Sequence, residues 1–532
     1  MSIKENITRV IRNFSGNSVD IDISVPEHES LGHYSTTVAF LLAKEKHISP
    51  IDMAEELASY LNTTSDIFDR VEAKAPGFVN MWVKPEVFFR ELKFILKEGD
   101  RYGKRKISRS RRKKVQIEFI SANPTGPLTL ANGRGGFLGD VLGNVLQMSG
   151  FDVEKEYYVN DTGNQIETLG NSILAASRLI PYEETFYKGE YVDYWARAHV
   201  AIVKRLKHDP LKLGKRAAKD FLKATRNVIE KKAGIYFDRY TSEDNDIHGK
   251  GYVKKALSLF QKNRSIYESD GALWLKTTEY GDDKDRVVLK KDGVPTYFLA
   301  DAGHYLETKK RGFDSKILIL GPDHHGYMAR IQAVASMVGI QKSDVMITQA
   351  VRLLENGREV KMSKRKGMFV TFEELVDEVG KDSARFFFLM ITPETHMDFD
   401  MSLAKERTLK NPVFYVQYAA VRAKSIMRKV KKPAIPDLSD LAVLSTEEDI
   451  RLMKTLAQFP EIILSVSSSY NIRRLTQYAL ELAKVFHGFY EKERVLGEEK
   501  NVVRARLTLI SATLIVFKNL FSVLGISFLK KM

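Results

Sequence analysis

Residues 115 to 146 read as a strand, a loop and a helix, and this order constrains the chain more than any other stretch. Val115, Ile117 and Phe119 belong to the apolar strand. Asn-Pro, Gly-Pro and Asn-Gly pairs interrupt regular structure between residues 123 and 133. Apolar residues then recur with helical spacing from Phe137 to Leu146. The stretch therefore predicts an α/β fold in which a strand feeds a helix through an irregular loop.

A loop of small residues that opens a helix lets phosphate approach backbone N–H groups and the positive helix end. The loop lacks the Gly-Lys-Ser/Thr ending of a Walker loop and the Gly-x-Gly-x-x-Gly of dinucleotide-binding folds. The two commonest phosphate motifs are thus excluded. An alternative is that the Asn-Gly turn is purely structural and only caps the helix.

Further strands and helices alternate after this stretch. A strand is expected at 155–159, and the apolar runs at 286–289 and 316–321 suit buried parallel strands. Helices rich in lysine and arginine at about 190–235 suggest an insertion. This alternation predicts a doubly wound, Rossmann-type sheet with ligands at the carboxyl ends of its strands.

The first 110 residues predict a small α/β domain. An amphipathic helix is expected from Ile3 to Phe14, a strand over 19–25, and a helix beginning at Ser49-Pro50. A strand over 75–83 places Phe78 and Asn80 on one face, where an aromatic ring and an amide could stack on and read an unpaired base. The alternative is that this face is packed under a helix.

Charge and composition bound the partners of the chain. Its net charge of +15, with a dense basic run at 104–114, points to a polyanion, with nucleic acid as the first candidate. The 532 residues include no cysteine, which excludes disulfides and thiolate metal sites. No apolar run looks long enough to span a membrane, and no signal peptide is recognisable, so we expect a cytoplasmic protein.

Two later segments carry polar residues suited to a substrate pocket. Tyr297 and Asp301 lie four residues apart on a predicted helix, where a phenol and a carboxylate could hold a guanidinium. The alternative is a surface polar pair. The adjacent His324 and His325 follow a strand in an expected extended loop, and because such neighbours point apart, no metal site is predicted.

Lys361-Met-Ser-Lys-Arg-Lys-Gly367 is the strongest short motif of the chain. Lysines that flank a flexible turn can close on a triphosphate and stabilise the negative charge that moves onto pyrophosphate. From about residue 400 the pattern turns helical. Tyr415, Tyr418 and Tyr490 are candidates for stacking on bases, although tyrosines at helical spacing are more often core residues.

These motifs resemble those of class I aminoacyl-tRNA synthetases, in the arginyl-tRNA synthetase version. Arg134-Gly135 and Gly139-Asp140 align Thr129-Leu-Ala-Asn132 with the family's His-x-Gly-His, so both histidines are replaced here. The 361–367 segment resembles the Lys-Met-Ser-Lys-Ser loop. Asp382-Ser-Ala-Arg385 resembles the motif that names the anticodon-binding domain. The Pro-Gly-Phe-x-Asn pattern at 76–80 resembles the family's extra N-terminal domain, which touches the outer corner of tRNA.

The resemblance implies a role for each matching residue. Catalysis would involve Lys361, Lys364, Thr129 and Asn132. ATP would contact Thr129, Ala131, Asn132, Gly321, Asp323, His324, His325, Met362 and Lys364. Arginine would be held by Glu118, Ser121, Asn123, Glu243, Tyr297, Asp301 and His324. Contacts with tRNA would come from Phe78, Asn80, Tyr415, Tyr418, Tyr490 and Met532.

The resemblance also implies the architecture and the partners. It implies an N-terminal tRNA-contacting domain over 1–110 and a catalytic domain over 111–400, with an insertion at about 165–285 and the lysine loop at 355–370. A helical anticodon-binding domain would occupy 401–532. The implied protein is a monomer away from membranes that uses tRNA(Arg), L-arginine and ATP with Mg²⁺, and it has no permanent cofactor and no resident metal. In this family, arginine activation generally requires tRNA.

Two other functions are weighed against this one. A synthetase-derived RNA-binding protein that has lost activation would explain the altered Thr129–Asn132 tetrapeptide, but it would not need the lysine loop. Another class I synthetase or a related nucleotidyltransferase would not share the N-terminal Phe78–Asn80 pattern or the segment 411–419.

Overall fold

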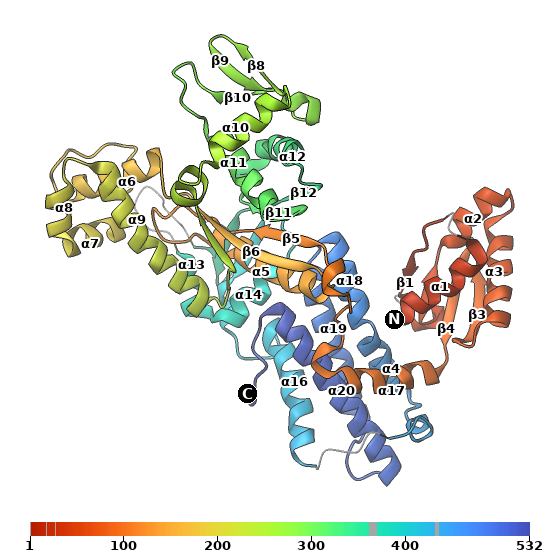
Figure 1. Ribbon diagram of the computed structural model, residues 1–532. Helices are drawn as coiled ribbons and strands as arrows, with labels where there is room; N and C mark the ends of the chain where they lie inside the picture. The colour runs from red at the N-terminus through yellow and green to blue at the C-terminus, as the bar shows by residue number, and fades with distance from the viewer. Residues whose placement is uncertain (1, 17–18, 27, 361–369, 431–435) are drawn as a thin grey trace.

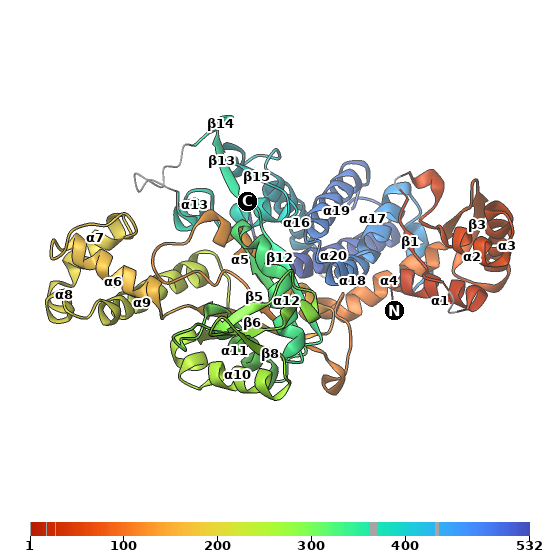
Figure 2. The ribbon, with the colours of Figure 1, turned by 90° about the horizontal axis from the view of Figure 1, so that it is seen from above.

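The computed structural model describes residues 2–16, 19–26, 28–360, 370–430 and 436–532. A parallel sheet lies at the centre of the molecule, a group of helices packs below it, and a small α/β unit lies to one side (Figure 1). Seen from above, this unit and the helices of residues 164–227 project from opposite ends (Figure 2).

The N-terminal unit is a four-stranded antiparallel sheet with helices packed on it. Its helices are α1 (Ile3–Ser15), α2 (Val38–Lys46) and α3 (Pro50–Thr64), and its strands, in spatial order, are β1 (Ile23–Ser24), β2 (Tyr34–Thr36), β4 (Phe78–Val83) and β3 (Phe68–Lys74). The predicted helix starts are confirmed, because the Ser49 side chain accepts a hydrogen bond from the Asp52 N–H and Pro50 occupies the first turn of α3. The strand expected over 19–25 is formed only by Ile23 and Ser24.

The N-terminal unit is joined to the rest of the chain by α4 (Pro85–Glu98) and docks on the later helices. The side chain of Glu461 accepts hydrogen bonds from the Lys4 N–H (3.0 Å) and the Tyr34 hydroxyl (3.3 Å). The hydroxyl of buried Tyr102 contacts the Leu456 carbonyl at 3.3 Å. These contacts connect segments more than 350 residues apart in sequence.

Five parallel strands form the central sheet and confirm the predicted doubly wound fold. Their spatial order is β12 (Lys342–Ile347), β11 (Ser315–Leu320), β5 (Lys114–Glu118), β6 (Asp152–Val159) and β7 (Arg239–Ser242). Ile319 of β11 packs with α5 (Leu130–Met148), and Leu318 packs on the other side with α11 (Tyr297–Lys310) and α12 (Met328–Met337). Because the strand order reverses between β5 and β11, ligands are expected beside the carboxyl ends of these two strands.

Helix α5 lies unusually close to the sheet because glycines face it. A Cβ at Gly139 would lie 2.3 Å from the Phe119 ring, and one at Gly143 would lie 2.5 Å from the Lys155 side chain. Only glycine permits this approach, so the sequence of α5 fixes how its first turn is placed at the sheet edge.

Two expectations about the middle of the chain were wrong in detail. Arg286–Leu289 is β10, which pairs antiparallel with β9 (Ala272–Leu275) and β8 (Ile266–Ser269) in a separate sheet. The segment expected as one insertion contains β7, a strand of the central sheet. The extra material is therefore divided in two by β7. Before it come α6 (Asn164–Ala176), α7 (Glu190–Ala198), α8 (Val200–Leu206) and α9 (Pro210–Asn227); after it come α10 (Tyr252–Lys262) and the small sheet.

A third small sheet and a group of helices complete the chain. The sheet has the order β14 (Arg358–Glu359), β13 (Val351–Glu355) and β15 (Met397–Asp400). The accompanying helices are α13 (Phe372–Val379), α14 (Lys381–Leu389), α15 (Met401–Lys405), α16 (Pro412–Arg428), α17 (Glu447–Ala457), α18 (Phe459–Ser469), α19 (Arg473–Lys492) and α20 (Lys500–Leu524).

By length and composition, α20 could cross a membrane, contrary to our expectation that no apolar run is long enough. Its apolar window has a mean hydropathy of 1.9, but 72% of that window is buried inside the protein. Because α20 packs against α4, α5 and α16, its apolar character is explained by its place in the core.

Buried Arg385 of α14 joins α5, the end of the inserted helices and α20. Its guanidinium donates to the carboxylate of Asp140 on α5, to the Ala233 (3.0 Å) and Gly234 (3.1 Å) carbonyls, and to the Leu524 carbonyl at 3.3 Å. On α5, Asp140 also contacts the Lys155 ammonium of β6 at 2.6 Å. Burial alone would raise the pKa of Asp140, but the charges of Arg385 and Lys155 outweigh burial and lower it.

We expect Arg385→Met to destabilise the protein by about 3–5 kcal/mol, because it leaves a buried carboxylate with one partner fewer. The measurement is the urea midpoint followed by far-UV circular dichroism. Arg352→Met is the matched control, since Arg352 makes a comparable ion pair with Asp398 at an exposed site. A midpoint as high in Arg385→Met as in Arg352→Met would contradict the prediction.

Candidate active site

The carboxyl end of β5 leads into a strained turn that fixes the start of the loop. Ile120 and Ser121 adopt positive φ angles of 64° and 38°, which side chains other than glycine rarely adopt. The Ser121 hydroxyl donates to Glu118 (3.2 Å) and accepts from the Tyr158 N–H (3.1 Å). Such strain persists where neighbouring contacts enforce it and is common at functional sites.

The residues predicted to contact ATP cap helix α5. The Thr129 hydroxyl donates to the Asn132 side-chain oxygen (2.8 Å), which also accepts from the Thr129 N–H (3.0 Å), and the Asn132 N–H donates back to Thr129 at 3.3 Å. Thr129 is thus the N-cap of α5, and Asn132-Gly133, expected to form a turn before the helix, lies inside its first turn. Capping does not exclude a nucleotide, because the N–H groups of this first turn still form the positive end of a buried helix.

Two other segments approach the first turn of α5. Gly321 follows β11, which is adjacent to β5 in the sheet. After the lysine motif, the Phe372 N–H donates to the Leu128 carbonyl (2.9 Å), and a Cβ at Gly133 would lie 2.1 Å from the Phe372 ring. Residues after the lysine motif thus lie beside the start of α5.

Several predicted site residues lie wholly or partly outside what the structure describes. Lys361, Met362 and Lys364 lie outside the described residues. The segment Pro322–Tyr327 forms a 3₁₀ helix instead of the expected extended loop. The side chains of Asp323, His324 and His325 are also outside what the structure describes.

Acidic side chains gather beside the first turn of α11, at the carboxyl ends of the strands. Glu243 follows β7, and Asp301 lies one turn into α11, where its carboxylate accepts from the Tyr327 hydroxyl. Burial raises the pKa of Asp301 well above its usual range, and the charges of Glu243 and Glu118 raise it further. Burial likewise raises the pKa of Glu243. Carboxylates that raise one another's pKa favour a cation between them.

The predicted partners of these acids are less enclosed. Tyr297 is 60% exposed, and Gly163 is near its phenol, since a Cβ there would lie 3.6 Å from the hydroxyl. Asn123 is half-buried in the loop after β5. Tyr297 thus lies at the surface, on the same helix as Asp301.

Sequence reasoning missed Tyr158 and Tyr327. Burial raises the pKa of the Tyr158 phenol, and the charges of Glu243, Asp301 and Glu118 raise it further, which places this ring among the three acids. Both tyrosines stand in segments whose motifs we had noted, at or just after the end of a strand. That position is the sequence signal that could have identified them.

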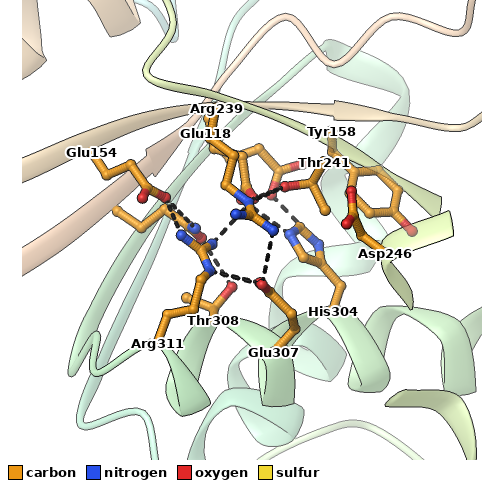
Figure 3. A network of polar contacts seen from close by, with 12 residues as sticks. Glu118, Glu154, Tyr158, Arg239, Thr241, Asp246, His304, Glu307, Thr308 and Arg311 are labelled. Carbon is orange, nitrogen blue, oxygen red and sulfur yellow. Dashed lines mark hydrogen bonds and ion pairs between the residues drawn. The ribbon is translucent and has the colours of Figure 1, made fainter. Parts of the chain in front are cut away.

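A network of buried charges lies beneath the acidic pocket. Figure 3 shows Arg239 and Arg311 among carboxylates of the strands and Glu307 of α11, with the His304 ring pointing towards the strands. The ligand atoms of Glu118, Glu156 and His304 are close enough to hold a metal ion. The Lys316 ammonium, 2.8 Å from Glu118 and 3.5 Å from Glu156, already supplies the positive charge there.

The N-terminal residues predicted to contact tRNA differ in exposure. Phe78 is 39% exposed, and its ring meets Phe40 edge-on at 5.7 Å. Asn80 is buried, and its side-chain oxygen accepts from the Ser35 hydroxyl at 2.8 Å. The core face of β4 is formed by Val79, Met81 and Val83.

Two of the predicted tyrosines of the helical region lie beside His487 of α19, and the third is connected to them through Arg422. Tyr415 and Tyr418 lie 4.8 and 5.9 Å from its ring. The Arg422 guanidinium lies over Tyr418 (4.6 Å) and over Tyr490 (4.8 Å), which is 41% exposed. Residues before Met532 are held on α16, because the Lys424 ammonium donates to the carbonyls of Phe528 and Leu529.

Comparisons with known proteins agree with this arrangement. The profile of the arginyl-tRNA synthetase N-terminal domain matches residues 1–83, that of the class I (R) tRNA synthetase catalytic domain matches 91–387, and that of the DALR anticodon-binding domain matches 416–532. An arginine–tRNA ligase of Citrifermentans bemidjiense is 41% identical, covering 96% of this chain and 95% of its own. The arginine–tRNA ligase of Carboxydothermus hydrogenoformans is 40% identical, and the match covers 96% of this chain and 94% of that protein.

A solved structure shows the same fold. The arginyl-tRNA synthetase of Thermus thermophilus superposes with a TM-score of 0.78 at 22% identity, covering 100% of this chain and 99% of its own. The sheet order, the helix that opens beside it and the helical region define a class I aminoacyl-tRNA synthetase, an ATP-using ligase. With the three profile matches and the 41% identity, the chain belongs to the arginyl-tRNA synthetase family.

We expect the KM for arginine to fall as pH rises through the range above the ordinary pKa of an aspartate, because the raised pKa keeps Asp301 protonated to higher pH and only its ionised form pairs with a guanidinium. Initial aminoacylation rates at saturating ATP and tRNA measure this dependence. In Glu243→Gln the change should move to lower pH, since Asp301 loses a neighbouring charge. A KM for arginine that is flat over this range would contradict the prediction.

Proposed function

We propose how the residues of this chain divide the work of arginine–tRNA ligation, the reaction of its family. The chain activates L-arginine with ATP to arginyl-adenylate and transfers arginine to the 3′-terminal adenosine of tRNA(Arg) for protein synthesis. The observation that carries the assignment of roles is the acidic pocket, where Glu118, Glu243 and Asp301 are close enough to Tyr158 for their charges to raise its pKa. A substrate with a guanidinium at one end and an ammonium at the other complements this pocket.

Glu118 and Asn123 would bind the α-ammonium of arginine, with Ser121 fixing the orientation of Glu118. Asp301, Tyr297 and Glu243 would bind the guanidinium. The fork of a guanidinium offers five donors, and a lysine ammonium would leave some acceptors of the pocket without partners. This difference supports selection of arginine over lysine.

ATP, entering with Mg²⁺, would lie between the first turn of α5 and the end of β11. Thr129, Ala131 and Asn132 would contact it on one side, and Gly321, Asp323, His324 and His325 on the other, with His324 also near arginine. Met362 would contact the nucleotide, and Lys361 and Lys364 would meet its phosphates. No side chain need act as a nucleophile, because positioning and charge stabilisation carry most of the catalysis at phosphorus.

The reaction then proceeds in two displacements. The arginine carboxylate attacks the α-phosphorus of ATP, the bond to the bridging oxygen breaks, and pyrophosphate leaves with charge that Lys361 and Lys364 would stabilise. A 2′-hydroxyl of the terminal adenosine then attacks the arginyl carbonyl, loses its proton and displaces AMP.

The remaining parts of the chain would bind tRNA(Arg). Residues 1–110 would contact it through Phe78 and Asn80, residues 111–400 would hold its acceptor end, and residues 401–532 would bind the anticodon through Tyr415, Tyr418, Tyr490 and Met532. The exposed Phe78 and Tyr490 rings support this division. We further propose that the protein acts as a cytoplasmic monomer.

ATP–pyrophosphate exchange tests the proposed function. Exchange that depends on arginine, needs cognate tRNA and fails with lysine would establish the activity and show that Thr129 and Asn132 suffice in place of two histidines. Tight tRNA binding without exchange under any of these conditions would instead identify an RNA-binding protein that has lost activation.

Lys364→Ala should lower the rate of arginine activation by about 10²–10³-fold, because it removes a positive charge from the developing pyrophosphate. Single-turnover formation of arginyl-adenylate with tRNA present measures this rate. The Kd for arginine should stay within about twofold, since the lysine acts mainly on the transition state. An unchanged rate would remove Lys364 from the catalytic set.

Phe78→Ala should raise the KM for tRNA(Arg) by about 5- to 100-fold, the range expected when one aromatic–base stack is lost. Phe94→Ala is the matched control, because Phe94 is 38% exposed and lies on α4, away from the sheet. Equal effects of the two substitutions would show that loss of a surface ring, and not stacking at Phe78, changes the KM.

A further inference from the structure

The charged network under the pocket is shared by four strands of the sheet and by α11. Its carboxylates are Glu118, Glu154, Glu156 and Glu307, and its permanent cations are Arg239, Arg311 and Lys316. His304 completes the network from α11 (Figure 3). Buried charges are costly, so a network of this size in the core needs a reason beyond stability.

Lys316 occupies the centre of the network and is fully buried on β11. Its ammonium lies 2.8 Å from Glu118 Oε2, 2.8 Å from Gln116 Oε1 and 3.5 Å from Glu156 Oε2. His304 Nε2 lies 3.3 Å from the same ammonium, so its three donors have close partners on several sides. The side chain of Lys316 therefore has one orientation, set by neighbours on β5 and β6.

Glu118 is the one carboxylate of the network that also reaches the pocket. One oxygen contacts Lys316, and the other accepts from the Ser121 hydroxyl at the strained turn. A carboxylate has about four acceptor positions, so two such contacts leave capacity for an incoming donor. The contacts with Lys316 and Ser121 each fix one oxygen, so the Glu118 carboxylate has a defined orientation.

We propose that Lys316 is a positioning residue for Glu118. Its contact with Glu118 holds that carboxylate in the orientation that receives the α-ammonium of arginine, so Lys316 acts on substrate selection without touching the substrate. The inference rests on the proposed role of Glu118.

Glu156 and His304 hold Lys316 in this position. Glu156 accepts from Thr241, from Arg311 (3.3 Å) and from His304 Nε2 (3.0 Å), so its carboxylate is fixed on several sides. Burial alone would raise its pKa, but the charges of His304 and Lys316 outweigh burial and lower it. The His304 ring also stacks on Tyr158 at 4.3 Å, which connects the network to the wall of the pocket.

Two ligands distinguish a positioning role of Lys316 from a general contribution of this residue to the stability of the protein. Arginine and 5-guanidinopentanoate differ only in the α-amino group, so the ratio of their Kd values reports on the groups that bind the α-ammonium, Glu118 and Asn123. Both values are measured by equilibrium dialysis with full-length protein and saturating tRNA. A substitution that merely loosens the fold weakens both ligands and leaves the ratio unchanged.

Three variants test the proposal. Glu118→Gln should reduce the preference for arginine by about tenfold or more, the usual effect of losing a charged hydrogen bond. Lys316→Met should reduce it by a similar factor while the Kd for 5-guanidinopentanoate stays within about twofold. The double variant should lose no more than Glu118→Gln alone, because the two residues act through one carboxylate.

Thr308→Val is the matched control. Thr308 is buried in the same network, 3.1 Å from Gln116, but has no contact with Glu118 among those described, so the preference should not change. Lys316→Gln, which keeps donors without the charge, replaces Lys316→Met if circular dichroism shows that the methionine variant is unfolded.

Two other outcomes would overturn the role of Glu118 or that of Lys316. An unchanged preference in Glu118→Gln overturns the proposed role of Glu118 itself. A reduced preference in Glu118→Gln, with an unchanged preference or equal weakening of both ligands in the folded Lys316 variant, overturns the positioning role of Lys316 and leaves that of Glu118 standing.

Discussion

The geometry of this protein depends on one buried carboxylate, Asp140. It lies in the middle of α5, whose first turn opens at the active site, and it binds Lys155 of β6 and Arg385 of α14 at the same time. Through Arg385 it also holds the carbonyls that end the inserted helices and α20. Ion pairs of this kind contribute little net stability, but they allow few alternative arrangements. The placement of the catalytic helix and the docking of the helical region therefore depend on the same contact.

The two groups of acids near the active site differ in how they are paired. Beneath the pocket, Glu154, Glu156 and Glu307 each contact arginine or histidine side chains. At the pocket itself, Asp301 and Glu243 raise the pKa of neighbouring groups, as expected where cations are too few. Helix α11 spans both regions, with Asp301 in its first half and His304 one turn later. Helix α11 thus connects the acidic pocket, where cations are too few, to the network beneath it, where the acids are paired with cations.

Much of the fold follows from local sequence, while the charged interior does not. The strand, loop and helix at 115–148 were predictable because apolar spacing and the Asn-Pro and Gly-Pro pairs act over short distances, but the Asn132-Gly133 pair expected to interrupt regular structure lies inside the helix. The antiparallel β10 was not, since a four-residue apolar run looks the same in either kind of sheet. Glu118 and Glu156 were hardest to interpret, because charged residues in a strand usually face solvent. Their partner Lys316 is 160 to 198 positions away, beyond the reach of any periodic pattern.

Helix α20 also determines the order in which the protein can be completed during synthesis. It follows every element that it contacts, yet Asn519 donates to the Gly99 and Tyr102 carbonyls, and the Val523 carbonyl accepts from Asn144 of α5. Domains generally begin to fold from the N-terminus while the ribosome is still translating. Until residue 524 has emerged from the ribosome, the linker after α4 and helix α5 therefore lack their contacts with α20. A ribosome that stalls before that point would carry a chain in which the faces of α4, α5 and α16 that α20 covers are exposed.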